Sequence, residues 1–79
     1  MKIELRLYAS LASHMPKRTS GNPWSFEISE GTRIRELLER LKIPTKAVKA
    51  VFLNGVHASG NEILDDGDRV GVFPPIGGG

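Results

Sequence analysis

The first residues of the chain alternate strictly between polar and apolar side chains. Ile3, Leu5 and Leu7 share one face of an extended segment, and charged residues occupy the positions between them. Successive side chains of a β-strand point to opposite faces, so a period of two residues is typical of a strand that is buried on one side. The pattern therefore predicts a half-buried strand over residues 2–8.

A second alternation follows after a long interruption. Trp24, Phe26 and Ile28 point the same way, which predicts another strand over residues 24–29. The intervening residues, 9–23, have no period and contain several chain-breaking residues: Pro16, Gly21 and Pro23. Such punctuation is typical of an exposed loop. The two segments are expected to form a hairpin with an extended connection.

The next pattern has the period of a helix. Apolar residues recur at positions i, i+3, i+4 and i+7: Ile34, Leu37, Leu38 and Leu41. This spacing gives one apolar stripe along an α-helix. Thr32 is the expected N-cap, because its hydroxyl can accept a hydrogen bond from a free N–H of the first turn. Pro44 is expected to end the helix near Lys42 or Ile43.

The second half of the chain consists of short apolar segments separated by turn signals. Strands are predicted from its β-branched and aromatic residues over 47–53, 56–58 and 69–73. Asn54-Gly55 is a strong signal for a tight hairpin turn, and a further turn is expected at residues 65–68. Residues 62–64 fit either a turn of helix or a brief strand. The predicted order of elements is therefore β-β-α-β-β-β.

A single helix with one apolar stripe needs a sheet face against which to bury it. The elements therefore predict an α+β fold, in which a mixed sheet of four to five strands carries one main helix on one face. Periodicity does not give the order of the strands within the sheet. If the first and last strands are neighbours at the centre, the arrangement is a β-grasp.

Composition and charge narrow the classes of function. The formal net charge of +2 is too small to indicate a nucleic-acid-binding face. No segment approaches the run of about 18 apolar residues that spans a membrane. The alternation begins at the second residue and leaves no room for a signal peptide, so we expect a cytoplasmic protein. The absence of cysteine excludes a disulfide framework and a thiolate metal site.

Residues that could carry catalysis are few. His14 and His57 are the only histidines and lie far apart in the sequence. The Asp-Asp-Gly-Asp segment at residues 65–68 lacks the spacing of a calcium loop and is better explained as a turn. Arginines of the predicted helix are interleaved with glutamates, as on a solvated helix face. The sequence therefore indicates no metal site, no bound cofactor and no catalytic centre within the chain itself.

The last six residues have a different character. Pro74-Pro75 directs the chain out of the last predicted strand in an extended form, since neither proline offers an N–H to a ladder. The residues that follow, Ile-Gly-Gly-Gly at 76–79, can span roughly 14 Å when fully extended. This thin segment can enter a narrow channel of another protein, where it presents one reactive group, the Gly79 carboxylate. Chemistry at a carboxylate requires activation, most simply as an acyl-adenylate.

Several motifs, taken in order along the chain, resemble one family. They are Leu7-Tyr8-Ala9-Ser10-Leu11, Glu30-Gly31-Thr32 with Glu36-Leu37-Leu38, Val51-Phe52-Leu53-Asn54-Gly55, Leu64-Asp65-Asp66-Gly67-Asp68-Arg69-Val70, and Val72-Phe73-Pro74-Pro75-Ile76-Gly77-Gly78-Gly79. In this order, and with a Gly-Gly end, they resemble the MoaD/ThiS sulfur carriers. The resemblance covers nearly the whole chain and is closest to the MoaD-like small subunit of molybdopterin synthase.

The resemblance implies a ubiquitin-like β-grasp domain over residues 1–75 and a flexible Gly-Gly tail over 76–79. It implies that Gly79, with Gly78 beside it, is adenylated by a partner of the ubiquitin-activating type, which consumes ATP. A sulfur donor would then convert the carboxylate into a thiocarboxylate. The partner-binding surface implied by the resemblance is the tail and the region around its root: Phe73, Pro74, Pro75, Ile76, Gly77, Tyr8 and His57.

Three functions remain open at this point. The favoured one is a sulfur carrier, not an enzyme, that serves molybdopterin, tungstopterin or related biosynthesis with a MoaE-like large subunit as a partner. The alternative is a ubiquitin-like protein modifier that is conjugated through Gly79 to lysines. The third is a plain β-grasp binding module, such as an RNA-binding relative, in which the tail is incidental.

Overall fold

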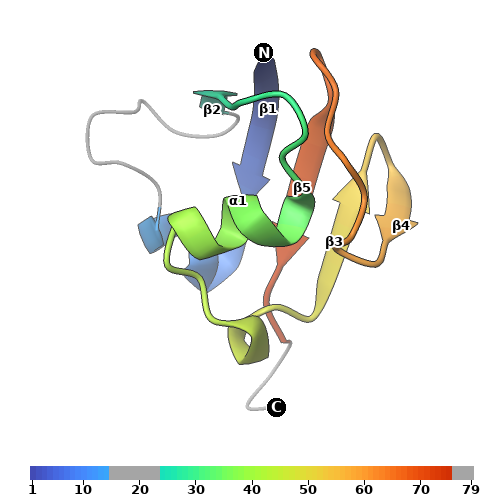
Figure 1. The fold of residues 1–79 in the computed structure, drawn as a ribbon. Coiled ribbons are helices and arrows are strands. Elements are labelled where there is room, and N and C mark those ends of the chain that lie inside the picture. Colours follow the sequence, from blue (N-terminus) through green and yellow to red (C-terminus); the bar gives the residue numbers. More distant parts are fainter. Residues whose placement is uncertain (15–23, 76–79) are drawn as a thin grey trace.

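Five strands form one mixed sheet in the computed structural model, which describes residues 1–14 and 24–75. The strands are β1 (Lys2–Leu7), β2 (Trp24–Glu27), β3 (Ala50–Leu53), β4 (Val56–Ala58) and β5 (Arg69–Phe73). Their order across the sheet is β2-β1-β5-β3-β4, with β1 and β5 parallel at the centre and the other pairs antiparallel. One α-helix, α1 (Ile34–Arg40), crosses one face of this sheet (Figure 1). The β-grasp arrangement predicted from the sequence is confirmed.

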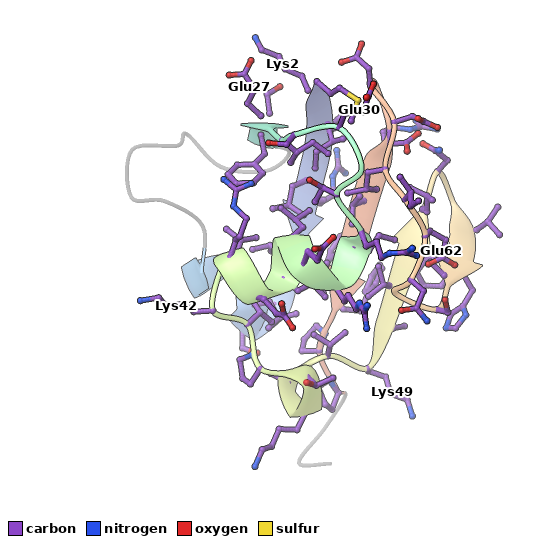
Figure 2. The ribbon with its side chains drawn as sticks, viewed as in Figure 1. Lys2, Glu27, Glu30, Lys42, Lys49 and Glu62 are labelled. Carbon is purple, nitrogen blue, oxygen red and sulfur yellow. The ribbon has the colours of Figure 1, made fainter. Side chains whose placement is uncertain are left out.

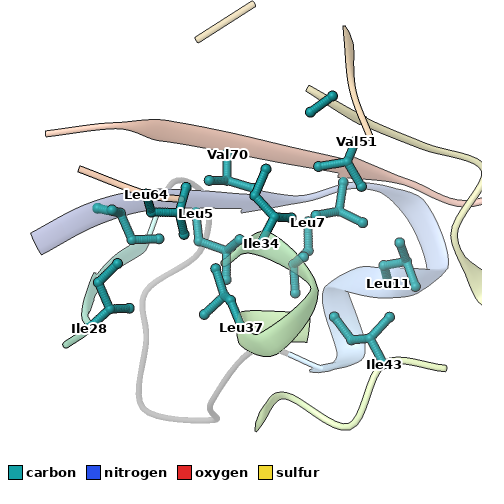
Figure 3. Packing of buried hydrophobic residues seen from close by; sticks show 13 residues of the cluster. Leu5, Leu7, Leu11, Ile28, Ile34, Leu37, Ile43, Val51, Leu64 and Val70 are labelled. Carbon is teal, nitrogen blue, oxygen red and sulfur yellow. The ribbon is translucent and has the colours of Figure 1, made fainter. Parts of the chain in front are cut away.

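The core lies between α1 and the sheet, as Figure 3 shows. The alternation of β1 is confirmed, because Leu5 and Leu7 are fully buried there while Lys2 and Arg6 face solvent. The helix contributes Ile34 and Leu37 from its stripe, and the central strand β5 contributes Val70 and Val72. Each fully buried side chain of this size contributes roughly 1.5–3 kcal/mol relative to an exposed one. The paired central strands thus carry much of the packing that fixes the fold.

The turns at residues 54–55 and 65–68 lie where the sequence predicted them. Asn54 and Gly55 both have positive φ, 53° and 84°, as the predicted two-residue hairpin turn between β3 and β4 requires. The turn around Gly67 is tied to β1: the Lys2 N–H donates to the Asp66 carboxylate at 2.8 Å, and the Gly67 N–H donates to the Lys2 carbonyl at 2.7 Å. The acidic segment at residues 65–68 is therefore a structural turn, as expected.

The N-cap of α1 is Arg33, not Thr32 as predicted. The carboxylate of Glu36 accepts a hydrogen bond from the Arg33 backbone N–H at 2.8 Å, which satisfies one of the free donors at this end. The Thr32 hydroxyl instead donates to the Ser29 carbonyl at 2.7 Å, within the preceding turn. The shift by one residue arises because Glu36 stands three positions after Arg33 and can reach back to it.

The C-terminal end of α1 also differs from the prediction. The helix ends at Arg40, before Pro44 could stop it, because Lys42 adopts a left-handed backbone with φ of 59°. The Lys42 N–H donates to the Glu39 carbonyl, and the Ile43 N–H donates to the Leu38 carbonyl, both at 3.0 Å. These two bonds form a Schellman motif, in which a non-glycine residue occupies the position that favours glycine.

Two short 3-10 helices replace segments predicted as loop and strand. The first, η1 (Ala9–His14), occupies the start of the predicted 9–23 loop and buries Leu11 in the core. The second, η2 (Thr45–Ala47), delays the predicted 47–53 strand, so that β3 begins at Ala50. Ile63 forms an isolated antiparallel bridge with Arg33, which decides the ambiguous 62–64 segment in favour of extended chain. The remainder of the predicted loop, residues 15–23, lies outside the described residues. No helix among the described residues is long and apolar enough to cross a membrane.

Candidate functional site

The sheet has a second face, turned away from α1, that no described element covers. The same period of two that buries Leu5 and Leu7 places the intervening side chains of β1 on this open face. The pairing registers bring side chains of the other strands alongside them, so that Arg6 is opposite Gly71, Gly71 is opposite Phe52, and Phe52 is opposite His57. The open face is therefore charged toward the start of β1 and aromatic toward its end.

Four rings form a continuous row near the end of β5, which we call the aromatic row: Tyr8, Phe73, Phe52 and His57. Tyr8 and Phe73 stack with ring centroids 4.1 Å apart and 7° between their planes. Phe52 meets Phe73 edge-on at 5.6 Å and His57 edge-on at 5.5 Å. Tyr8, Phe52 and Phe73 are half-buried and His57 is exposed, so the row presents aromatic surface to solvent. Exposed aromatic clusters of this kind are typical of protein-binding surfaces.

A hollow of about 430 Å³ lies beside the row, over the side of the sheet that α1 leaves free. Its lining includes Arg6, Tyr8, Phe52, Gly71 and Phe73. Gly71 forms part of its floor: a Cβ added there would lie 3.5 Å from Cε2 of Tyr8 and 3.8 Å from Cε1 of Phe73. Because Gly71 has no side chain, no atom projects from its backbone into the hollow. We call this hollow the Gly71 hollow.

The root of the tail is held on both sides at the end of β5. The Lys49 N–H donates to the Phe73 carbonyl at 2.8 Å, and the Tyr8 N–H donates to the Val72 carbonyl at 3.1 Å. Pro74 and Pro75 follow, both half-buried. Figure 2 shows Lys49 at this end of the sheet. The chain therefore leaves the central strand directly beside the aromatic row, from a position fixed by β1 and by the residue before β3.

Comparison with known proteins places the chain in a family. The profile of the ThiS family matches residues 17–79. The chain belongs to the ThiS family. No curated protein sequence matches it significantly.

Three solved structures resemble this ThiS-family protein over essentially their whole length. The putative molybdopterin converting factor subunit 1 from Pyrococcus furiosus is 29% identical, with a TM-score of 0.70 over 95% of this chain and 98% of that one. SAMP1 from Haloferax volcanii is 19% identical, with a TM-score of 0.72 over 100% of both chains. A complex of subunits 1 and 2 of the molybdopterin-converting factor from Helicobacter pylori matches at 22% identity, with a TM-score of 0.62 over 100% of both chains. The similarities to the Haloferax and Helicobacter structures are evidence for the fold alone.

The structure gathers some of the predicted site residues of the ThiS-family protein and leaves others undescribed. Tyr8, Phe73 and His57 meet in one row, although they come from three separate segments. Pro74 and Pro75 follow directly. The remaining tail residues lie outside the described part of the chain: Ile76, Gly77, Gly78 and Gly79. Within residues 1–14 and 24–75, no group of three or more histidine, aspartate or glutamate side chains could hold a metal ion.

Sequence reasoning missed two contributors to this surface of the ThiS-family protein. Phe52 links Phe73 to His57, and Arg6 lies opposite Gly71 across the central strand pair. The alternation of β1 already placed Arg6 on the solvent side of its strand. Only the strand order and register reveal which residues of the other strands lie beside it. Those registers are long-range, and periodicity does not encode them.

One carboxylate of the ThiS-family protein has a shifted pKa. Glu62 accepts hydrogen bonds from the backbone N–H groups of Ser59 at 2.9 Å and Gly60 at 2.8 Å, and from the Ser59 hydroxyl at 3.3 Å. These bonds, above all the one from the Ser59 N–H, hold the pKa of Glu62 below its ordinary value of 4.5. Glu62, labelled in Figure 2, thereby closes the loop that follows β4, which is a structural role.

Proposed function

We propose that this ThiS-family protein is a sulfur carrier, not an enzyme, whose Gly79 carboxyl is converted to a thiocarboxylate for molybdopterin, tungstopterin or related biosynthesis. The observation that carries the proposal is the position of the tail. Pro74-Pro75 continues directly from the central strand and is followed in the sequence by an Ile-Gly-Gly-Gly end, and the aromatic row lies beside the two prolines. Residues 1–75 form the docking body in this proposal, and residues 76–79 form the reacting tail.

The chemistry takes two steps at one carboxyl group. An ionised carboxylate is a poor electrophile, so an oxygen of Gly79 first attacks the α-phosphorus of ATP and pyrophosphate leaves. A sulfur donor, written here as hydrosulfide, then attacks the acyl carbon. AMP departs with the electron pair of the C–O bond, the sulfur loses its proton, and a thiocarboxylate remains. The chain binds no cofactor in this scheme, because the partner enzyme binds and consumes the ATP.

Two partners of the protein follow from this scheme. The first is an adenylating enzyme of the ubiquitin-activating type, which must admit the tail as far as Gly79. The second is a MoaE-like subunit, which the complex of molybdopterin-converting factor subunits from Helicobacter pylori supports. Both would dock on the aromatic row, since the tail leaves the body beside it. We place the carrier in the cytoplasm, where ATP and sulfur donors are available.

Mass spectrometry tests the proposal directly. The protein is incubated with the adenylating enzyme from the same organism, ATP and sulfide, and its intact mass is measured. We expect the gain of one oxygen-to-sulfur exchange, which localises to Gly79 after proteolysis. A variant that lacks Gly78 and Gly79 serves as the control and should gain nothing. An unchanged mass with an enzyme that adenylates another carrier contradicts the proposal.

A protein modifier is the second candidate, because the same activated carboxyl can be attacked by a lysine amine. Incubation with cell extract and ATP would then yield conjugates of higher mass, with the tail joined to lysine side chains. The two functions differ in the nucleophile that attacks the activated Gly79 carbon: sulfur for the carrier and a lysine amine for the modifier. Thiocarboxylate without conjugates supports the carrier, and conjugates without thiocarboxylate support the modifier.

A further inference from the structure

The Gly71 hollow combines an aromatic wall with two arginines. Arg6 lies directly opposite Gly71 in the parallel pairing of β1 and β5. Arg69 precedes Gly71 by two residues on β5 and therefore faces the same side of the sheet. Both arginines line the hollow together with Tyr8 and Phe73. The hollow is thus apolar along one side and cationic along the other.

The guanidinium groups of both arginines are available for a new contact as far as the described residues are concerned. Within residues 1–14 and 24–75, neither Arg6 nor Arg69 forms a side-chain hydrogen bond or an ion pair. One carboxylate also lines the hollow, that of Glu4, which stands opposite Arg69 in the strand register. Glu4 therefore offsets the charge of its direct neighbour Arg69 more than that of Arg6. One positive charge remains in excess, and it is centred on the Arg6 side.

We propose that the Gly71 hollow accepts a single carboxylate side chain of the partner protein, with Arg6 as its main contact. The inference rests on the proposed function, because it describes how the partner of the tail docks. A guanidinium presents a planar fork of donors that matches a carboxylate, and this pairing strengthens when docking excludes water. Apolar residues beside the acidic one cover Tyr8, Phe52 and Phe73.

The charges favour a carboxylate over a phosphate. The hollow carries a net charge of only +1, from two arginines and Glu4. A dianionic phosphate would exceed this charge and would be repelled by the Glu4 carboxylate. The Tyr8 and Phe73 rings lie within contact distance of the bare backbone at Gly71, and the hollow beside them extends to Arg6, so a side chain can enter between Arg6 and the aromatic row. An acidic residue flanked by apolar ones therefore matches both the charge and the shape of the site.

The first experiment probes the hollow without any enzyme. The isotopically labelled full chain is titrated with two capped tripeptides, Phe-Glu-Leu and Phe-Gln-Leu, and amide and arginine Nε–H signals are followed by NMR. We expect both peptides to shift the Gly71 amide and only the acidic one to shift the Arg6 Nε–H signal. The acidic peptide should bind about fivefold more tightly. Equal affinity of the two peptides, or no shift at Gly71 with either, overturns the proposal.

Charge variants make this experiment sharper. R6Q should remove the preference for the acidic peptide, and E4Q should increase it, because E4Q removes the opposing carboxylate. R35Q is the matched control, since Arg35 is an exposed arginine on α1, on the opposite side of the sheet, and it should leave the preference unchanged. A preference lost equally in R6Q and R35Q would reflect net charge only and would overturn the assignment. A Gly71 shift that depends on protein concentration without peptide would assign the hollow to self-association instead.

The second experiment uses the adenylating enzyme. R6Q should raise the KM for the carrier roughly tenfold with kcat unchanged, whereas R35Q should alter neither constant. If the wild-type chain is never adenylated, the proposed function fails while the peptide titration still reports on the hollow. If the wild-type chain is adenylated and R6Q has the same KM, the inference fails and the proposed function stands.

Discussion

The rings of Tyr8 and Phe73 stack 4.1 Å apart with their planes 7° from parallel, which joins the end of β1 to the end of β5. The contact lies one residue before Pro74-Pro75, so it links the aromatic row to the point where the chain leaves β5. Phe52 completes the surface by meeting Phe73 edge-on at 5.6 Å. Phe73 therefore contacts two rings, those of Tyr8 and Phe52, and is the inner residue of the row that lies next to the prolines.

Replacing Phe73 by alanine should weaken partner docking more than it weakens the fold. Because the ring is half-buried, we expect a loss of about 1–2 kcal/mol in the free energy of unfolding. Binding to the adenylating enzyme should fall by about 2 kcal/mol or more, as at a central interface aromatic. Urea denaturation and calorimetric titration measure the two effects. V56A is the control, since Val56 is 69% exposed; equal binding losses in both variants would contradict the assignment.

Replacing Lys42 by glycine should stabilise the protein. Lys42 holds a left-handed backbone at φ of 59° in the motif that ends α1, a conformation that glycine adopts without the clash of a Cβ. We expect a gain of about 0.5–1 kcal/mol in the free energy of unfolding, read from the urea midpoint at unchanged slope. K46G should instead destabilise, because Lys46 lies in η2 and not at a positive-φ position. A destabilised K42G protein would refute this account of the helix end.

The pH dependence of stability should carry the signature of Glu62. Its pKa is lowered in the folded state by hydrogen bonds from Ser59 and Gly60. The stabilisation is therefore fully present above the unfolded value near 4.5 and disappears as the pH falls through the lower folded pKa. The stability difference between wild type and E62Q should shrink over that range in thermal melts. A wild-type advantage over E62Q that grows on acidification would contradict the lowered pKa of Glu62 in the folded state.

Adding one alanine after Gly79 should abolish thiocarboxylate formation while leaving the fold intact. Both steps of the proposed chemistry require the free carboxyl group of Gly79, and an amide in its place has no carboxylate oxygen with which to attack ATP. The measurement is the sulfur-exchange mass gain together with an unchanged melting curve. Insertion of the same alanine between Ser29 and Glu30, in the exposed turn before α1, is the matched control for chain length. Full activity of an untrimmed extended chain would show that another group reacts.

Elements with a strong local period were predictable, and those set by long-range pairing were not. The alternation of β1 and the stripe that contains Ile34 and Leu37 reflect burial on one side, which sequence spacing records directly. The end of α1 at Arg40 was predicted a few residues too late, near Lys42 or Ile43, because the left-handed position at Lys42 carries no glycine. The η1 helix was missed because a single buried leucine, Leu11, gives no period.

The candidate site likewise contains residues that could be predicted from the sequence and residues that only the strand pairing reveals. The resemblance to the MoaD/ThiS carriers assigned Tyr8, His57, Phe73 and the two prolines to it, and the structure brings Tyr8 and Phe73 into contact. Phe52 joins them only because β3 pairs with β5 in the register that sets it opposite Gly71. A shift of one residue in that pairing would turn the Phe52 ring to the helix side of the sheet. This contribution to the site is therefore a property of strand pairing and not of local sequence.

The central place of β5 has a mechanical consequence. The strand that ends in the tail is bonded to β1 on one side and to β3 on the other. A partner that pulls on the tail along the strand direction therefore strains both ladders in shear, and many hydrogen bonds must yield together before the strand slips. A tail leaving from β4 at the edge would transmit the same pull to a single ladder, which could open in sequence. Force applied at the proposed reactive end is therefore borne by the one strand that joins the β1 and β3 ladders.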